Sequence, residues 1–150
     1  MSSVSQIVKA PRAAVYRACL DPKTIARWRV PDSMTGEVHS FDAREGGGYR
    51  MTLTYRDSHH PVGGKTSTHA DSFQGRFLEL IPDTKIVETV RFETDKPDLQ
   101  MRMTLTTSFR DVDGGTEVTI LCENLPPGVR PEDNELGTRQ SLKKLAALFA

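Results

Sequence analysis

Two carboxylates fall on apolar faces of alternating segments, where acid–base or ligand-binding chemistry could arise. Asp71 has the same parity as Phe73 and Phe77, and Glu88 has the parity of Val90. A carboxylate that faces an apolar interior must find a partner or take a raised pKa, and such groups concentrate at functional sites. A single β-bulge would turn either side chain out to solvent. Two interpretations therefore stay open, a solvated or salt-bridged carboxylate and a polar anchor of an apolar pocket.

Two glycine-rich stretches resemble nucleotide-binding loops but lack essential parts. Gly63–Thr66 ends like a P-loop, yet position 59, where the first glycine belongs, is His59. This segment also links two expected strands instead of a strand and a helix. Gly46–Gly48 does not match the dinucleotide fingerprint and indicates a hairpin turn with positive backbone angles. We expect no cofactor at either stretch.

The histidines and cysteines do not form a metal-binding or nucleophile pattern. His59 and His60 are adjacent, while His39 and His69 belong to separate expected strands, so no metal site is predicted. Cys19 and Cys122 are far apart in sequence, which favours buried, reduced thiols over a disulfide framework.

Cys122 is in phase with Val118 and Ile120 on an expected strand. That phase is typical of a small core side chain, with a thiol that faces a ligand as the alternative.

A curved antiparallel sheet is the element that must position these groups. In the segment Phe41–Tyr55, Tyr49, Met51 and Leu53 share one face, and arginine and threonine occupy the other. Turn-forming clusters of Pro, Asp and Gly separate further alternating runs. The predicted strands cover residues 4–9, 36–43, 48–56, 68–80, 85–93, 99–111 and 116–123.

Helices are predicted at both ends of this order. A short helix should follow Pro11 to about Leu20, and a second should start at Asp21-Pro22 and end before Pro31. A long amphipathic helix is predicted from about residue 131 to the end, with an apolar stripe that should lie on the concave face of the sheet. The stripe consists of Thr138, Ser141, Leu142, Leu145, Leu148 and Phe149.

Composition excludes several function classes. The 150 residues have the size of one domain, and 20 basic residues balance 20 acidic ones. A net charge of zero argues against nucleic acid as a partner, and the lack of a long apolar run argues against membrane insertion and a signal peptide. We expect one cytoplasmic domain, either a monomer or a homodimer.

Five segments in the correct order resemble one protein family. They are Asp21 to Pro31, the turn Asp42 to Tyr49, the strand end Gly75 to Pro82, Gly115-Thr116, and Gly137 to Leu145. Together they resemble the START-like (SRPBCC) superfamily, and within it the bacterial proteins related to the activator of the Hsp90 ATPase. The resemblance implies an α+β helix-grip (START/Bet v 1-like) fold, in which a curved sheet of six to seven antiparallel strands wraps around the last helix.

The chain departs from this family pattern at two positions. Many relatives have a second tryptophan after Trp28 and a tryptophan in the last helix, where this sequence has Arg29 and Thr138. A pocket in this chain is therefore expected to be roomier or more polar than in those relatives.

Three functions are consistent with this reading. The first is a non-enzymatic binding protein that holds a small hydrophobic or amphipathic molecule between the last helix and the sheet. The second is a module that contacts a chaperone ATPase. The third is an enzyme similar to polyketide cyclases and aromatases, with Asp71 or Glu88 as acid or base. The predicted ligand-binding residues are Trp28, Tyr49, Met51, Leu53, Asp71, Phe73, Glu88, Phe92, Met103, Cys122, Thr138 and Leu142.

Overall fold

A computed structural model describes residues 1–56 and 70–150 of the chain. The histidines at positions 59, 60 and 69, and the Gly63–Thr66 stretch, lie outside the described residues.

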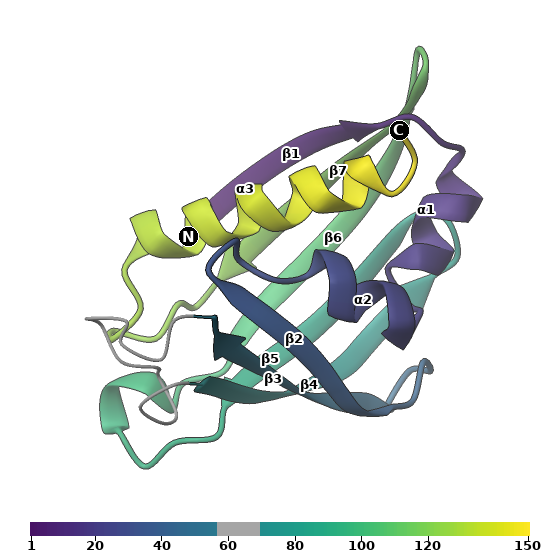
Figure 1. Cartoon of the computed structure of the whole chain (residues 1–150). Helices are drawn as coiled ribbons and strands as arrows, with labels where there is room; N and C mark the ends of the chain where they lie inside the picture. The colour runs from purple at the N-terminus through teal and green to yellow at the C-terminus, as the bar shows by residue number, and fades with distance from the viewer. Residues whose placement is uncertain (57–69) are drawn as a thin grey trace.

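One curled sheet of seven antiparallel strands forms the framework (Figure 1). Its spatial order is β1-β7-β6-β5-β4-β3-β2, so the six strands after the first form a meander and the last of them, β7, pairs with β1. This confirms the predicted helix-grip architecture. The strands are β1 (Ser2–Val8), β2 (Met34–Phe41), β3 (Gly48–Tyr55), β4 (Ala70–Ile81), β5 (Lys85–Phe92), β6 (Met103–Val112) and β7 (Gly115–Glu123).

Two short helices connect β1 to β2. Helix α1 spans Arg12–Ala18 and helix α2 spans Pro22–Trp28. As predicted, Asp21 caps α2: its carboxylate accepts a hydrogen bond from the Lys23 backbone N–H at 2.9 Å. The helix ends at Trp28, earlier than the stop expected at Pro31, which leaves Arg29 as the residue that caps its C-terminus.

Two local predictions need correction. Strand β6 begins at Met103 and not at position 99, because Pro97–Leu99 form a short 3₁₀ turn, η1, first. Of the three glycines in the β2–β3 turn, only Gly46 has a positive backbone angle, with φ at +83°.

The C-terminal helix α3 spans Pro131–Ala147 and packs along β1, with a second contact to α2 (Figure 1). Leu142 and Leu145 are fully buried in this packing. Lys144 ties the helix to the segment after α2, since its Nζ donates to the Val30 carbonyl at 2.6 Å. None of the described helices is long and apolar enough to cross a lipid bilayer.

The inner face of the sheet keeps the side-chain parity that the sequence predicts. Strand β4 has a register shift, but it falls between Phe77 and Glu79, beyond the position of Asp71. Asp71 and Glu88 are therefore both inside, 2% and 4% exposed. The interpretation that they are solvated is wrong, and Glu88 is instead a buried, salt-bridged carboxylate.

Candidate functional site

The predicted ligand-binding residues all contribute to the interior. Leu53 and Thr138 are half-buried, and the other ten are buried. Three directly opposed residue pairs of β3 and β4 lie on this inner surface. They are Tyr49 with Gly75, Met51 with Phe73, and Leu53 with Asp71. Their role in binding stays a prediction, but their position on one inner surface is a property of the fold.

Three polar groups, the buried Tyr49 and Glu88 and the partly buried Arg29, meet on this apolar surface. One oxygen of Glu88, Oε1, accepts a hydrogen bond from Arg29 Nη2 at 2.8 Å and a second, short one from the Tyr49 hydroxyl. The Arg29 guanidinium also stands 5.3 Å from the centre of the Tyr49 ring, within reach of a cation–π contact. We refer to Arg29, Tyr49 and Glu88 as the inner triad.

Gly75 explains how Tyr49 reaches Glu88. The two residues are directly paired across β3 and β4, and the tyrosine ring lies over the glycine. A Cβ atom at position 75 would come within 2.1 Å of the ring, so no other residue fits beneath it. The missing side chain lets the phenol cross β4 and hydrogen-bond to Glu88 on β5.

Arg29 is the member of the triad that the sequence prediction of site residues missed. Its backbone N–H still bonds to the Ile25 carbonyl at 2.9 Å, so the last turn of α2 fixes its position above the sheet. A signal was present in the sequence, because Arg29 stands where many relatives have a second tryptophan. That departure predicted a roomier or more polar pocket, and the polar side chain at this position contacts Glu88 and Tyr49.

The electrostatics of the triad follow from burial. Although burial disfavours its charge, the attraction of Glu88 raises the pKa of Arg29, which stays protonated. Burial, more than any other cause, raises the pKa of Tyr49 well above its usual value. The phenol therefore stays neutral, keeps its proton and donates a hydrogen bond to Glu88.

Arg29 retains hydrogen-bonding capacity beyond this triad. Its guanidinium carries five N–H groups, and one nitrogen, Nη2, serves Glu88. In the described part of the chain, every buried side-chain nitrogen or oxygen has a hydrogen-bond partner. Any nitrogen of Arg29 without such a bond is therefore open to the surrounding space, in agreement with an 18% exposed side chain.

The two cysteines are free and buried, as the sequence predicted. Burial raises the pKa of Cys19 to about 12 and raises that of Cys122 as well. Both remain thiols near neutral pH, so neither is an activated nucleophile.

The remaining predicted residues are distributed around the triad. Phe73 touches the rings of both Tyr49 and Phe92, with centroids 6.3 Å apart in each pair. Trp28 turns its indole N–H to the Ala18 carbonyl at 3.4 Å, and Thr138 donates to the Asn134 carbonyl at 2.8 Å. The first of these hydrogen bonds joins α2 to α1, and the second lies within α3.

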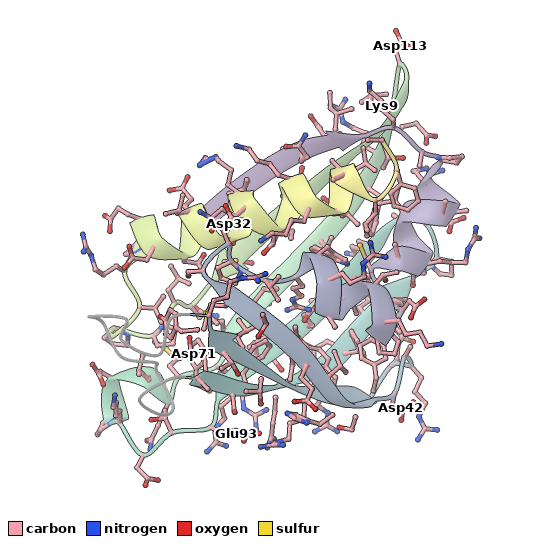
Figure 2. All side chains as sticks on the ribbon, viewed as in Figure 1. Lys9, Asp32, Asp42, Asp71, Glu93 and Asp113 are labelled. Atoms are coloured by element: carbon pink, nitrogen blue, oxygen red, sulfur yellow. The ribbon has the colours of Figure 1, made fainter. Side chains whose placement is uncertain are left out.

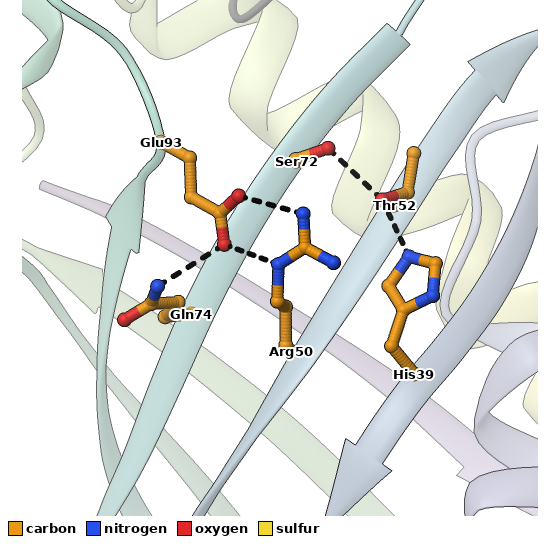
Figure 3. A network of polar contacts seen from close by, with 6 residues as sticks. All are labelled: His39, Arg50, Thr52, Ser72, Gln74 and Glu93. Atoms are coloured by element: carbon orange, nitrogen blue, oxygen red, sulfur yellow. Dashed lines mark hydrogen bonds and ion pairs between the residues drawn. The ribbon is translucent and has the colours of Figure 1, made fainter.

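The outer face of the same strands carries a different polar network (Figure 3). Arg50 donates twice to Glu93, at 2.7 and 2.9 Å, and Gln74 donates to the same carboxylate at 3.1 Å. Beside it, Thr52 joins His39 to Ser72. Figure 2 shows Glu93 at the outer side of the sheet, whereas Asp71 lies towards the interior.

The fold is shared with proteins of known structure. A crystallised protein from Chromobacterium violaceum is 35% identical, with a TM-score of 0.86, and the match covers 99% of this chain and 95% of that protein. A protein from Arthrobacter aurescens, 16% identical over 98% of this chain and 84% of its own, has a TM-score of 0.81. One from Mycobacterium smegmatis, also 16% identical, covers 99% and 89% with a TM-score of 0.74.

Proteins of curated function provide no significant match to this chain. A family match is nevertheless extensive, since residues 9–150 fit the family described as activator of Hsp90 ATPase homolog 1-like protein. With nearly the whole chain matched and the helix-grip sheet in place, this chain belongs to the activator of Hsp90 ATPase homolog 1-like family within the START-like superfamily.

Proposed function

We propose that the protein binds a small amphipathic molecule between α3 and the inner face of the sheet, with the inner triad holding the polar end of that molecule. The observation that carries the proposal is a charged pair, Arg29 and Glu88, in the middle of an apolar interior. A buried ion pair adds little to stability, because the loss of hydration offsets the attraction between the charges. Buried polar groups in an otherwise apolar site are instead typical of ligand anchors.

The chemistry of the triad defines the polar end of the ligand. Glu88 already accepts two hydrogen bonds at one oxygen, whereas Arg29 has N–H groups to spare. A hydrogen-bond acceptor, either a carbonyl or an acidic group, is the complementary partner. Aromatic rings around the triad, among them Phe73 and Phe92, supply apolar surface for the rest of the molecule.

The test is thermal unfolding against a library of fatty acids and aromatic carboxylic acids. A ligand that binds the folded state raises the unfolding midpoint in a concentration-dependent way. Leu53→Trp should abolish this rise, since position 53 is half-buried on the inner face next to Asp71. Leu78→Trp is the matched control, because Leu78 is 51% exposed, and it should leave the rise intact.

Two outcomes would contradict the proposal. One is a library in which no member raises the midpoint. The other is a ligand that stabilises both tryptophan variants as well as the original chain, which would place its binding outside the interior.

The family description favours a second candidate, contact with a chaperone ATPase. That function predicts a changed rate of ATP hydrolysis by an Hsp90-type chaperone when the protein is added. Leu53→Trp should leave such an effect unchanged, because the contact would use an outer surface. No change in rate at saturating protein would exclude this candidate.

Burial of Asp71 and Glu88 also meets the condition for a cyclase-like enzyme, which needs an interior carboxylate. In this alternative Asp71 or Glu88 is the acid or base, and Asp71 is the one whose substitution leaves the bonds of Glu88 to Arg29 and Tyr49 in place. Asp71→Asn would then remove turnover of a bound substrate while binding persists. A ligand that is released chemically unchanged favours the binding protein.

A further inference from the structure

A hollow lies on the outer face of the sheet beside the Gly46–Gly48 turn. Its volume is about 280 Å³, and its charged lining consists of Arg76, Arg91 and Arg102. The lining includes no carboxylate. It is therefore a strongly positive site on a protein whose net charge is zero.

The three arginines are unpaired. All are exposed, and none makes an ion pair or a side-chain hydrogen bond with another described residue. Glu93, a carboxylate on the same face, is already bound by Arg50. Arg110, on the same face within β6, has its own partner in Glu117 at 2.7 Å. Arg50 and Arg110 on this face are thus paired, whereas the arginines of the hollow are not.

Strand register brings these charges together. Arg76 pairs with Thr89 across β4 and β5, so Arg91 is its diagonal neighbour two positions along. Val90 pairs with Met103 at the end of the β5–β6 register, and the adjoining residues, Arg91 and Arg102, both line the hollow. Like charges at neighbouring cross-strand positions destabilise a sheet, and an anion between them removes that repulsion.

Part of the wall of the hollow is backbone. Glycines at positions 46 to 48 and at 75 line it together with the arginines. The N–H groups of Gly46 and Gly47 already donate to the carbonyls of Phe77 and Arg44. Recognition at this site must therefore come from the guanidinium groups, whose planar forks suit oxyanions.

We propose that this hollow binds a small oxyanion with two or more negative charges, of the phosphate or the polycarboxylate class. The site is separate from the inner triad, since its lining includes none of the triad residues and its arginines are exposed on the outer face of the sheet. Its size suits a small anion or the charged end of a larger metabolite.

The test is titration of the protein at low salt with pyrophosphate and, separately, with citrate, followed by NMR. Saturable shifts of the arginine Nε–H signals and of the Gly46–Gly48 amides are expected. Arg91→Gln and Arg102→Gln should each weaken binding about tenfold or more, because each removes a charged hydrogen-bond donor. Arg110→Gln, which removes the same charge from the same face outside the hollow, should leave the affinity unchanged.

Thermal unfolding without anion tests separately whether the arginines of the hollow repel one another. Arg91→Gln should unfold at the same temperature as the original chain or slightly higher, because a repulsion between like charges is removed. Binding of only one of the two anions supports the site and identifies its class. Absence of saturable binding by either anion, or an equal loss in Arg110→Gln, would overturn the proposal.

Discussion

Two arginine–glutamate pairs lie on opposite faces of the sheet, and one is much more exposed to water than the other. Tyr49 and Arg50 are consecutive on β3, so one points inward to Glu88 and the other outward to Glu93. Inside, Arg29 completes the pair with Glu88 at 2.8 Å. The bond lengths of the two pairs are nearly equal, but Glu88 is 5% exposed at its side chain and Glu93 is 25% exposed.

Two ion pairs of nearly equal length can therefore differ in how much their loss changes the stability of the protein. Outside, water hydrates either charge when its partner is lost, so the pair contributes little. Inside, neither charge can be left alone without a large loss of hydration energy. Each charge of the inner pair therefore depends on the other, and removal of either one should lower the stability of the fold.

The strongest test of this contrast is Arg29→Ala. It leaves the Glu88 carboxylate buried with the Tyr49 hydroxyl as its remaining donor in the triad. The free energy of unfolding should fall by about 3–5 kcal/mol, as for other broken buried pairs. Denaturant titration measures this loss.

The control removes both charges together. Arg29→Met combined with Glu88→Leu should recover most of the lost stability, since a buried pair replaced by apolar groups of similar size is often neutral. If the double variant were less stable than Arg29→Ala, the pair would be a structural element and the argument for a ligand anchor would weaken.

Gly75→Ala is expected to have the next largest effect. The added methyl group would come within 2.1 Å of the Tyr49 ring, which must move away from Glu88. Overpacking together with the displaced hydroxyl should lower the free energy of unfolding by about 2–3 kcal/mol. Gly114→Ala is the control for crowding, because an added methyl group there meets no neighbouring atom. Any loss of stability in that variant comes from backbone strain at a φ of +84°.

The sequence predicts the fold well because its signals are local and repeated. Alternation on β3 and β5, turn clusters between strands, and the Asp21-Pro22 helix start each determine nearby structure. Parity also placed Asp71 and Glu88 inside, since the one bulge in β4 falls beyond Asp71. No property of the sequence alone could locate that bulge.

The triad could be predicted only in part. Tyr49 and Glu88 follow from strand alternation, but their contact depends on Gly75, whose missing side chain opens the path between β3 and β5. Arg29 comes from a helix end 59 residues before Glu88, and its direction is set by where α2 stops. Contacts of this kind depend on tertiary packing, which local patterns do not encode.

Tyr49→Phe isolates the hydroxyl at a smaller expected effect. The ring still packs over Gly75, and Glu88 keeps its bond to Arg29, so one hydrogen bond to a charged acceptor is lost. The free energy of unfolding should fall by about 1–2 kcal/mol. A Tyr49→Phe variant as stable as the original would show that Arg29 alone satisfies Glu88.

The smallest effect is expected for the Arg50–Glu93 pair on the outer face. Its contribution to stability should be detectable through its dependence on pH. Hydrogen bonds from Arg50, and then from Gln74, hold the pKa of Glu93 below its ordinary value. A lowered pKa in the folded state means that the contribution of Glu93 is complete above the ordinary carboxyl range and disappears as the pH falls through the lowered value. The stability difference between the original chain and Glu93→Gln should therefore shrink on acidification, and it should also shrink with added salt because the pair is exposed. A difference that persists in strong acid or at high salt would show that Glu93 acts through packing, and the contrast between the two faces would no longer be one of hydration.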